Sequence, residues 1–210
     1  MTDRVEQYLG SRKKNPKQRE FFDERAGIWD EISVHDAEKV AYIADLLDLE
    51  DGMDVLDVGT GTGVMIPYYL ERMDGGKVTA IDYSPAMIEV AKRKYPESER
   101  LAYRAMDLYD LDGTQEYDRV VCYSCFPHFP DPMGALRVLS KQLKPYGTLC
   151  IAHSSSRDHI NHVHECGGRE ICNDFLPEID IMIEMFEQAG LDPVFSRDDS
   201  EYYIIIGRRR

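Results

Sequence analysis

The sequence predicts an α/β domain in which helices cover both faces of a seven-stranded, mostly parallel sheet. Short apolar runs alternate with segments of helical periodicity along most of the chain, which is typical of a doubly wound sheet. The last two runs, at 192–195 and 202–206, are too close together for a crossover helix, so the final strand should run antiparallel. A length of 210 residues suits one such domain.

The first 35 residues should form one or two helices that lie on the body of the domain rather than in its sheet. Their aromatic side chains Phe21, Phe22 and Trp29 follow Pro16 closely. The segment 36–49 then repeats apolar residues at the spacing of an amphipathic helix. We therefore expect an N-terminal helical lid segment, 1–35, followed by the main domain, 36–210.

The regular alternation begins at residue 53, and its helices carry local start and stop signals. Ser84 is an N-cap residue and Pro85 suits a first helical turn. Glycines 75 and 76 end one helix, and Gly190 ends another. The predicted strands lie at 53–58, 77–82, 101–104, 118–123, 147–152, 192–195 and 202–206, and the predicted helices lie at 64–73, from 85 onward, at 134–142 and at 178–189.

The composition of the chain limits which partners and which cellular compartment are expected. The chain has 25 Lys and Arg against 39 Asp and Glu, a net charge of −14, and such a surface repels phosphate backbones and anionic lipids. We therefore expect neither a nucleic-acid nor a membrane partner. The chain starts without the apolar run of a secretory signal, and its five cysteines are an odd number, so reduced thiols in the cytoplasm are expected.

A glycine-rich loop follows the first predicted strand. Gly59, Gly61 and Gly63 lie at a strand-to-helix junction, where open α/β sheets bind ligands. Asp57 precedes the loop, and Asp82 ends the next predicted strand. The loop has Gly-x-Gly-x-Gly spacing instead of the dinucleotide Gly-x-Gly-x-x-Gly pattern, and an acid beside it suits a ligand with an ammonium group. A nicotinamide-dependent oxidoreductase is therefore the less favoured alternative.

Four ordered segments make the chain resemble the class I S-adenosylmethionine-dependent methyltransferases. Residues 55–63 resemble the first motif of that family, 80–88 its second-strand motif, 105–107 its adenine-contact turn and 143–149 the segment entering its fifth strand. The resemblance implies a Rossmann-like fold and S-adenosylmethionine as the cofactor. Residues 21–26, with the following Trp-Asp pair, also resemble the N-terminal lid of members that act on small molecules.

The same resemblance assigns roles to individual residues. It implies that Gly59 and Gly61 lie against the methionine part of the cofactor. Asp82 would accept hydrogen bonds from both ribose hydroxyls, and Asp107 would accept one from the adenine amino group. Asp57 would orient the loop and help to satisfy the ammonium group. The remaining predicted cofactor residues are Tyr83 and Met106, which would flank the adenine ring, together with Gly63 and Met87.

The acceptor side of the site is less clearly marked. The segment 122–129, at the end of the fourth predicted strand, contains Cys125 and His128, and in the resembled family this strand end faces the transferred methyl group. Four of the six histidines lie within 153–164, after the fifth predicted strand, in an expected substrate-recognition insert at about 153–177. We predict that His153, His164 and His128 are catalytic, with a histidine serving as general base.

The histidine-rich stretch also has ligands for a metal. If 157–166 is helical, His159, His162 and Cys166 lie on one side of the helix, while Asn161 and His164 share another side. Imidazole and thiolate are good ligands for zinc. A divalent metal such as zinc, held by His153, His159, His162, His164 and Cys166, is therefore a second hypothesis beside the general base.

The sequence thus predicts a cytoplasmic methyltransferase that uses S-adenosylmethionine and acts on a small-molecule substrate. Its main alternative is a non-catalytic module that binds S-adenosylmethionine or a metal and regulates another protein. Release of S-adenosylhomocysteine with candidate acceptors distinguishes the two, because the regulatory module would bind the cofactor without turnover.

Overall fold

A computed structural model describes residues 2–12, 15–113, 116–168 and 170–210. Residues 1, 13 and 14 of the predicted lid segment, and residue 169 of the predicted insert, lie outside the described residues. Within the described ranges, none of the helices combines the length and the apolar character that a bilayer span requires.

The sheet has seven strands in the order β3-β2-β1-β4-β5-β7-β6, with β7 antiparallel to both of its neighbours. The predicted mixed sheet and its antiparallel last strand are therefore confirmed. The direction in which successive strands are added to the sheet reverses between β1 and β4, so the carboxyl ends of these two strands form the switch point of the sheet. The strands are β1 (Asp54–Val58), β2 (Lys77–Asp82), β3 (Leu101–Ala105), β4 (Tyr117–Tyr123), β5 (Leu143–His153), β6 (Leu191–Asp198) and β7 (Tyr203–Arg209).

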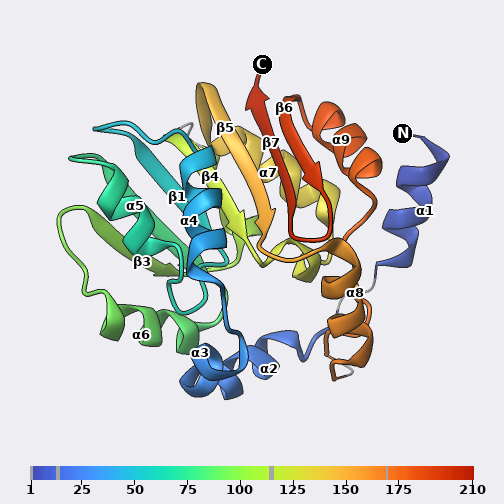
Figure 1. The fold of residues 1–210 in the computed structure, drawn as a ribbon, viewed down its shortest axis with the longest axis horizontal. Helices are drawn as coiled ribbons and strands as arrows, with labels where there is room; N and C mark the ends of the chain where they lie inside the picture. The colour runs from blue at the N-terminus through green and yellow to red at the C-terminus, as the bar shows by residue number, and fades with distance from the viewer. Residues whose placement is uncertain (1, 13–14, 114–115, 169) are drawn as a thin grey trace.

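Nine α-helices are present in the described part of the chain (Figure 1). Asp36, the first residue of the predicted helix 36–49, caps α4 by accepting from two backbone N–H groups. Ser84 caps α6 as predicted, accepting from the Met87 N–H. The helices are α1 (Asp3–Ser11), α2 (Gln18–Arg25), α3 (Trp29–Ile32), α4 (Ala37–Leu46), α5 (Ile66–Arg72), α6 (Pro85–Lys94), α7 (Pro132–Gln142), α8 (Arg157–Cys166) and α9 (Ile179–Gln188).

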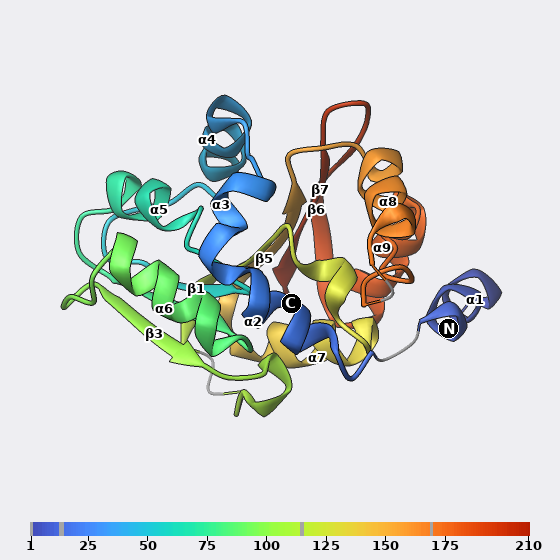
Figure 2. The same ribbon diagram turned by 90° about the horizontal axis from the view of Figure 1, so that it is seen from below.

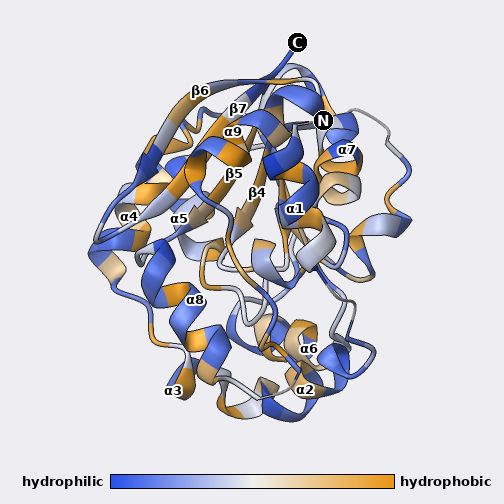
Figure 3. Cartoon of the chain, turned by 90° about the vertical axis from the view of Figure 1, so that its right-hand side faces the viewer, coloured by the Kyte–Doolittle hydropathy of each residue, from blue (hydrophilic) through white to orange (hydrophobic). Residues whose placement is uncertain are grey.

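The sheet separates two hydrophobic cores. Side chains alternate between its faces, so Val55 of β1 packs with α4, α5 and α6, whereas Leu56 packs with α7 and α9. Figure 2 shows α4 and α5 on one side of the sheet and α7 on the other. In Figure 3 the strands β4 and β5 carry much orange, whereas α8 is drawn mainly in blue. This layering holds the strand ends rigidly where the functional site lies.

The N-terminal segment differs from the predicted one or two adjoining helices. It divides into two parts that pack at different places. In the first part, Val5 and Tyr8 of α1 are buried against the core beside α9. Arg4 adds an exposed ion pair to Glu178 at 2.7 Å. The second part, α2, a 3₁₀ turn (Ala26–Ile28) and α3, packs on α6. Figure 1 shows α2, α3 and α8 beyond the tips of β4 and β5.

Candidate functional site

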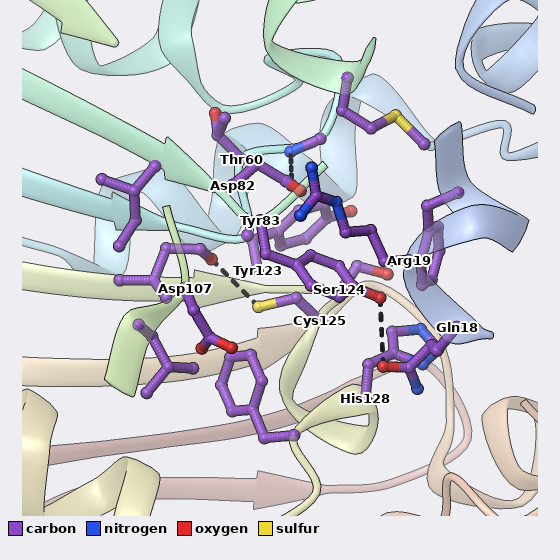
Figure 4. A pocket seen from close by; sticks show the side chains of 18 of the residues that line it. Gln18, Arg19, Thr60, Asp82, Tyr83, Asp107, Tyr123, Ser124, Cys125 and His128 are labelled. Carbon is purple, nitrogen blue, oxygen red and sulfur yellow. Dashed lines mark hydrogen bonds between the residues drawn. The ribbon is translucent and has the colours of Figure 1, made fainter. Parts of the chain in front are cut away.

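A cleft opens at the carboxyl ends of β1, β2 and β4 and is covered by α2 and α3. The cover contributes Phe22 from α2 and Trp29 from α3. The floor comes from the strand ends and the loops that follow them (Figure 4). Of the nine predicted cofactor residues, seven line this cleft: Gly59, Gly61, Asp82, Tyr83, Met87, Met106 and Asp107.

The two other predicted cofactor residues, Asp57 and Gly63, support the loop without lining the cleft. The Asp57 carboxylate accepts from the Thr60 hydroxyl at 2.6 Å and from the Tyr69 hydroxyl at 3.1 Å. Burial raises the pKa of Asp57 to about 6. Its predicted part in orienting the loop agrees with these bonds, whereas its predicted contact with a ligand ammonium finds no support in this placement.

Asp82 joins the glycine loop to the next helix. One carboxylate oxygen accepts from the Gly61 N–H at 2.9 Å, and the other accepts from the Ser84 N–H at 2.8 Å. Burial raises the pKa of Asp82 to about 6. A carboxylate has about four lone-pair positions, so each oxygen can accept one further hydrogen bond from a ligand in the cleft.

The turn after β3 closes this end of the cleft. The Met106 N–H donates to the Asp82 carbonyl at 2.9 Å, which ties the turn to β2. Asp107 accepts from the Tyr109 N–H at 3.2 Å and begins a 3₁₀ turn (Leu108–Asp110). Asp107 is exposed and lines the cleft, and its carboxylate has further lone pairs that can accept a hydrogen bond from an amino group.

An aromatic cluster lines the cleft beneath α2 and α3. The Phe22 ring lies 5.4 Å from the Trp29 ring, 6.1 Å from Tyr83 and 5.1 Å from His128, in edge-on arrangements. Tyr123 also lines the cleft, and its hydroxyl lies 2.8 Å from His35 Nδ1 and 2.7 Å from the Ser154 hydroxyl. A flat or apolar group can pack against this wall.

Several of these residues carry no sequence signal that identifies them. Gln18 and His35 line the cleft, yet they lie in segments without a motif. Asp174, which bonds His128, lies in an irregular stretch near the end of the predicted insert. The only related sequence signal is the resemblance of the N-terminal segment to a lid. It predicts that this segment covers the cleft, but it does not indicate which of the side chains face the cleft.

Cys125 and His128 follow the tip of β4, as predicted, and both line the cleft. The Cys125 thiol donates to the Val58 carbonyl at 3.1 Å, and burial raises its pKa well above the ordinary value. It is therefore a structural thiol. His128 lies in a 3₁₀ turn (Phe126–His128) and bonds Asp174 through Nδ1 at 2.7 Å.

The histidine-rich stretch forms α8 over the predicted range, Arg157–Cys166, and the two sides of this helix are as predicted. Asn161 and His164 face the segment before α9: Asn161 exchanges two hydrogen bonds with the Leu176 backbone, and the ring of His164 bonds the Asp174 carbonyl. On the other side, His162 Nε2 lies 3.7 Å from the Cys166 sulfur, and both residues are exposed.

The predicted metal ligands are not brought together. His159, His162 and Cys166 are exposed on α8, whereas His153 and His164 are buried. Among the described residues, no group of three or more His, Cys, Asp or Glu side chains is placed to hold a metal ion. The physical reason is that α8 turns His164 toward the domain and its other histidines away from it.

His153 is buried away from the cleft. It is the last residue of β5, where strand alternation puts it on the same face as Leu149 and Ile151, opposite Tyr203 of β7. Its side chain is 1% exposed, and neither ring nitrogen has a hydrogen-bond partner among the residues that the structure describes. Its predicted catalytic role therefore finds no support in this position. Burial lowers the pKa of His153 to about 3.

This burial predicts a pH-dependent stability. The unfolded chain takes up a proton near pH 6.5 and the folded His153 does not, so stability is lost as pH falls below 6.5. Between pH 8 and pH 5, the parent should lose about 2 kcal/mol more unfolding free energy than His153→Leu. Urea unfolding at both pH values measures it.

His159→Leu is the matched control, because His159 is exposed and should leave the pH dependence as it is. Some acid sensitivity should persist in His153→Leu, since burial also lowers the pKa of His164, to about 4. Equal acid losses in the parent and in His153→Leu would contradict the prediction.

The comparison with known families decides the nature of the cleft. Residues 56–151 match the methyltransferase domain family. This part of the chain is a class I S-adenosylmethionine-dependent methyltransferase domain. The predicted family resemblance is thereby confirmed, and the nicotinamide alternative is set aside.

Curated relatives of this methyltransferase domain agree with the match. The malonyl-[acyl-carrier protein] O-methyltransferase of Acetivibrio thermocellus is 35% identical over 112 residues, which cover 52% of this chain and 39% of that protein. The ubiquinone biosynthesis O-methyltransferase of Xanthomonas oryzae pv. oryzae is 36% identical over 117 residues, which cover 54% and 48%. The matched region thus spans less than half the length of either relative.

A solved structure extends the likeness of fold beyond the matched domain. The N-methyltransferase NodS of Bradyrhizobium japonicum, in complex with S-adenosyl-L-homocysteine, has a TM-score of 0.72, with 92% of this chain and 98% of that chain covered at 14% sequence identity. An identity this low establishes the shared fold alone.

The residues of the cleft fit the methyl donor of the family. Gly61 has a φ of +55°, and a Cβ added there would meet nothing within 4 Å, so the loop leaves open space at its apex. Asp82 offers a buried carboxylate with spare acceptor capacity, and Met87 and Met106 add apolar surface beside it. Together they match the needs of a ribose, an adenine and a sulfonium side chain.

Proposed function

We propose that this chain transfers a methyl group from S-adenosylmethionine to an oxygen atom of a small-molecule acceptor. The observation that carries the proposal is the continuity of the cleft. The glycine loop and Asp82 line the same cavity as Phe22, Trp29 and His128. A donor held by the glycine loop and Asp82 would present its methyl group toward an acceptor packed beside His128.

The methyl donor supplies an activated methyl group on a positively charged sulfur, so the protein has to align the reactants and exclude water. The cover of the cleft suits this task. Asp23 of α2 accepts from the Ser84 hydroxyl at 2.5 Å, and Asp30 of α3 accepts from Thr62 at 2.5 Å and from Lys94 at 2.6 Å. These bonds hold α2 and α3 over the glycine loop and α6, consistent with the predicted lid.

Oxygen is proposed as the acceptor atom because both curated relatives are named O-methyltransferases. A small acceptor agrees with a cleft that α2 and α3 cover and that Phe22, Trp29 and Tyr83 line. We further propose the cytoplasm as the compartment, because the five cysteines are free thiols and three of them, Cys122, Cys125 and Cys150, are buried in the domain.

Two measurements test this function. Calorimetry with S-adenosylhomocysteine should show binding, and the protein should transfer a radiolabelled methyl group from S-adenosylmethionine to at least one compound in a panel of small alcohols, phenols and carboxylic acids. Binding without transfer to any compound would favour the regulatory module. Absence of binding would overturn the proposal.

A further inference from the structure

A buried carboxylate orients His128, which lines the cleft in the turn that follows β4. Asp174 Oδ2 accepts from His128 Nδ1 at 2.7 Å and from Gln18 Nε2 at 2.7 Å, and the Asp174 side chain is 5% exposed. Since an ionised carboxylate only accepts hydrogen bonds, the Nδ1 atom of His128 carries the hydrogen. Its Nε2 atom is then left with the lone pair that can take a proton.

Residues from distant segments hold this pair in place. Arg12 lies 3.6 Å from Asp174 Oδ1, where it supplies the opposite charge, and it also donates to the carbonyls of Pro127 and Phe129 on either side of His128. The Tyr83 hydroxyl donates to Gln18 Oε1 at 3.1 Å and fixes the orientation of that amide. Figure 4 shows Tyr83, Gln18 and His128 together at one side of the cleft.

His164 lies behind the pair rather than in the cleft. Its ring centre is 4.9 Å from that of His128, and its Nδ1 atom donates to the Asp174 backbone carbonyl. Burial lowers the pKa of His164 to about 4, so this ring is neutral at pH 7. It fixes the Asp174 backbone and leaves the carboxylate to His128.

We propose that His128 is the general base of the reaction, that Asp174 is its positioning residue, and that the acceptor is a hydroxyl group. The proposal rests on the proposed function, which already places an oxygen acceptor in the cleft. A carboxylate acceptor is ionised at neutral pH and needs no base, whereas an alcohol or a phenol has to lose a proton. A histidine with its Nε2 atom prepared for that proton, on the acceptor side of the cleft, favours the hydroxyl.

The step balances without a further reactant. The hydroxyl proton passes to His128 Nε2, and the acceptor oxygen forms its bond to the methyl carbon. The carbon–sulfur bond breaks with its electron pair remaining on sulfur. The imidazolium of His128 is stabilised by the Asp174 carboxylate and returns its proton to solvent after the products leave.

A purely structural role for Asp174 and His128 predicts a different result in a series of acceptors. The probes are para-substituted phenols, from 4-methylphenol, which stays protonated at pH 8, to 4-nitrophenol, which is largely ionised there. His128→Gln should lower kcat/KM by at least about 100-fold for 4-methylphenol but by less than about threefold for 4-nitrophenol, because the ionised phenol needs no base. A structural loss would lower both rates equally and overturn the proposal.

Asp174→Asn should follow the same trend, with a loss of at least about tenfold for 4-methylphenol, because the amide no longer dictates which ring nitrogen of His128 carries the hydrogen. His159→Gln is the matched control, since His159 is an exposed histidine of the same insert. S-adenosylhomocysteine affinity, measured by calorimetry, should stay within about threefold of the parent in all three variants.

A third readout needs neither turnover nor a folded Asp174 variant. Long-range proton–nitrogen correlation spectra of the parent protein at pH 8 should show His128 as the Nδ1–H tautomer. The Nε2–H tautomer would overturn the proposal, and so would a parent that methylates carboxylic acids but no phenol or alcohol. A parent that fails to bind S-adenosylhomocysteine would instead overturn the proposed function, so the two failures are distinguishable.

Discussion

Replacing Asp82 with alanine is expected to weaken S-adenosylhomocysteine binding by about 2–4 kcal/mol, counting two charge-assisted hydrogen bonds with partial compensation by water. The carboxylate lies at the end of β2, lines the cleft and is oriented by the Gly61 and Ser84 N–H groups. Calorimetry of the parent and the variant measures the loss. Asp110→Ala is the matched control, because Asp110 is an exposed acid of the neighbouring 3₁₀ turn and does not line the cleft.

The same carboxylate predicts a pH dependence of binding. Burial raises the pKa of Asp82 to about 6, so below pH 6 the acid is increasingly protonated and accepts ribose hydroxyls poorly. The parent should therefore lose affinity as pH falls through 6, by up to about tenfold per pH unit. Asp82→Ala should be flatter, and Asp57, whose pKa burial also raises to about 6, should contribute to the dependence that remains. Equal affinity of parent and variant at pH 8 would remove Asp82 from the site.

The cofactor end of the cleft was predictable because its determinants are local. The Gly-x-Gly-x-Gly loop directly follows β1, Asp82 is the last residue of β2 and Ser84 caps the helix that comes next, so each is marked by its own few neighbours in the sequence. The strand β2 has the predicted bounds. Asp57 shows the limit of this reasoning. Its position beside the loop was evident, but the Tyr69 hydroxyl that turns its carboxylate away from the cleft belongs to the next helix.

The acceptor end depends on tertiary packing, which the sequence pattern does not reveal. His128 was identified from its place after β4, yet its partners Gln18 and Asp174 come from α2 and from the segment before α9. His153 was expected to leave the strand tip for the cleft. Instead β5 includes it, and strand alternation directs its side chain into the core beside Tyr203.

Gly59→Ala should damage both the fold and the cofactor site, because the loop has no room for a side chain at this position. A Cβ at residue 59 would lie 2.7 Å from the Cβ and 2.9 Å from the sulfur of Cys125, and the φ of Gly59 is +65°. Adding the cost of a left-handed alanine, about 1–2 kcal/mol, to that of overpacking, about 1–3 kcal/mol, gives an expected destabilisation of about 2–5 kcal/mol. Urea unfolding measures this change.

Gly61→Ala separates steric conflict from backbone strain. Gly61 has a similar φ, +55°, but its added Cβ would meet nothing within 4 Å, so only the backbone cost of about 1–2 kcal/mol is expected in the free protein. Because Gly61 lines the cleft, this variant should instead lose S-adenosylhomocysteine affinity.

Cys125→Gly removes both atoms that an alanine at position 59 would meet. Combined with Gly59→Ala, it should recover at least about 1 kcal/mol of unfolding free energy, as a double-mutant cycle would show. Equal destabilisation by the two glycine substitutions, with no coupling to Cys125, would mean that the loop yields to the added methyl group and that contact with Cys125 does not set its shape.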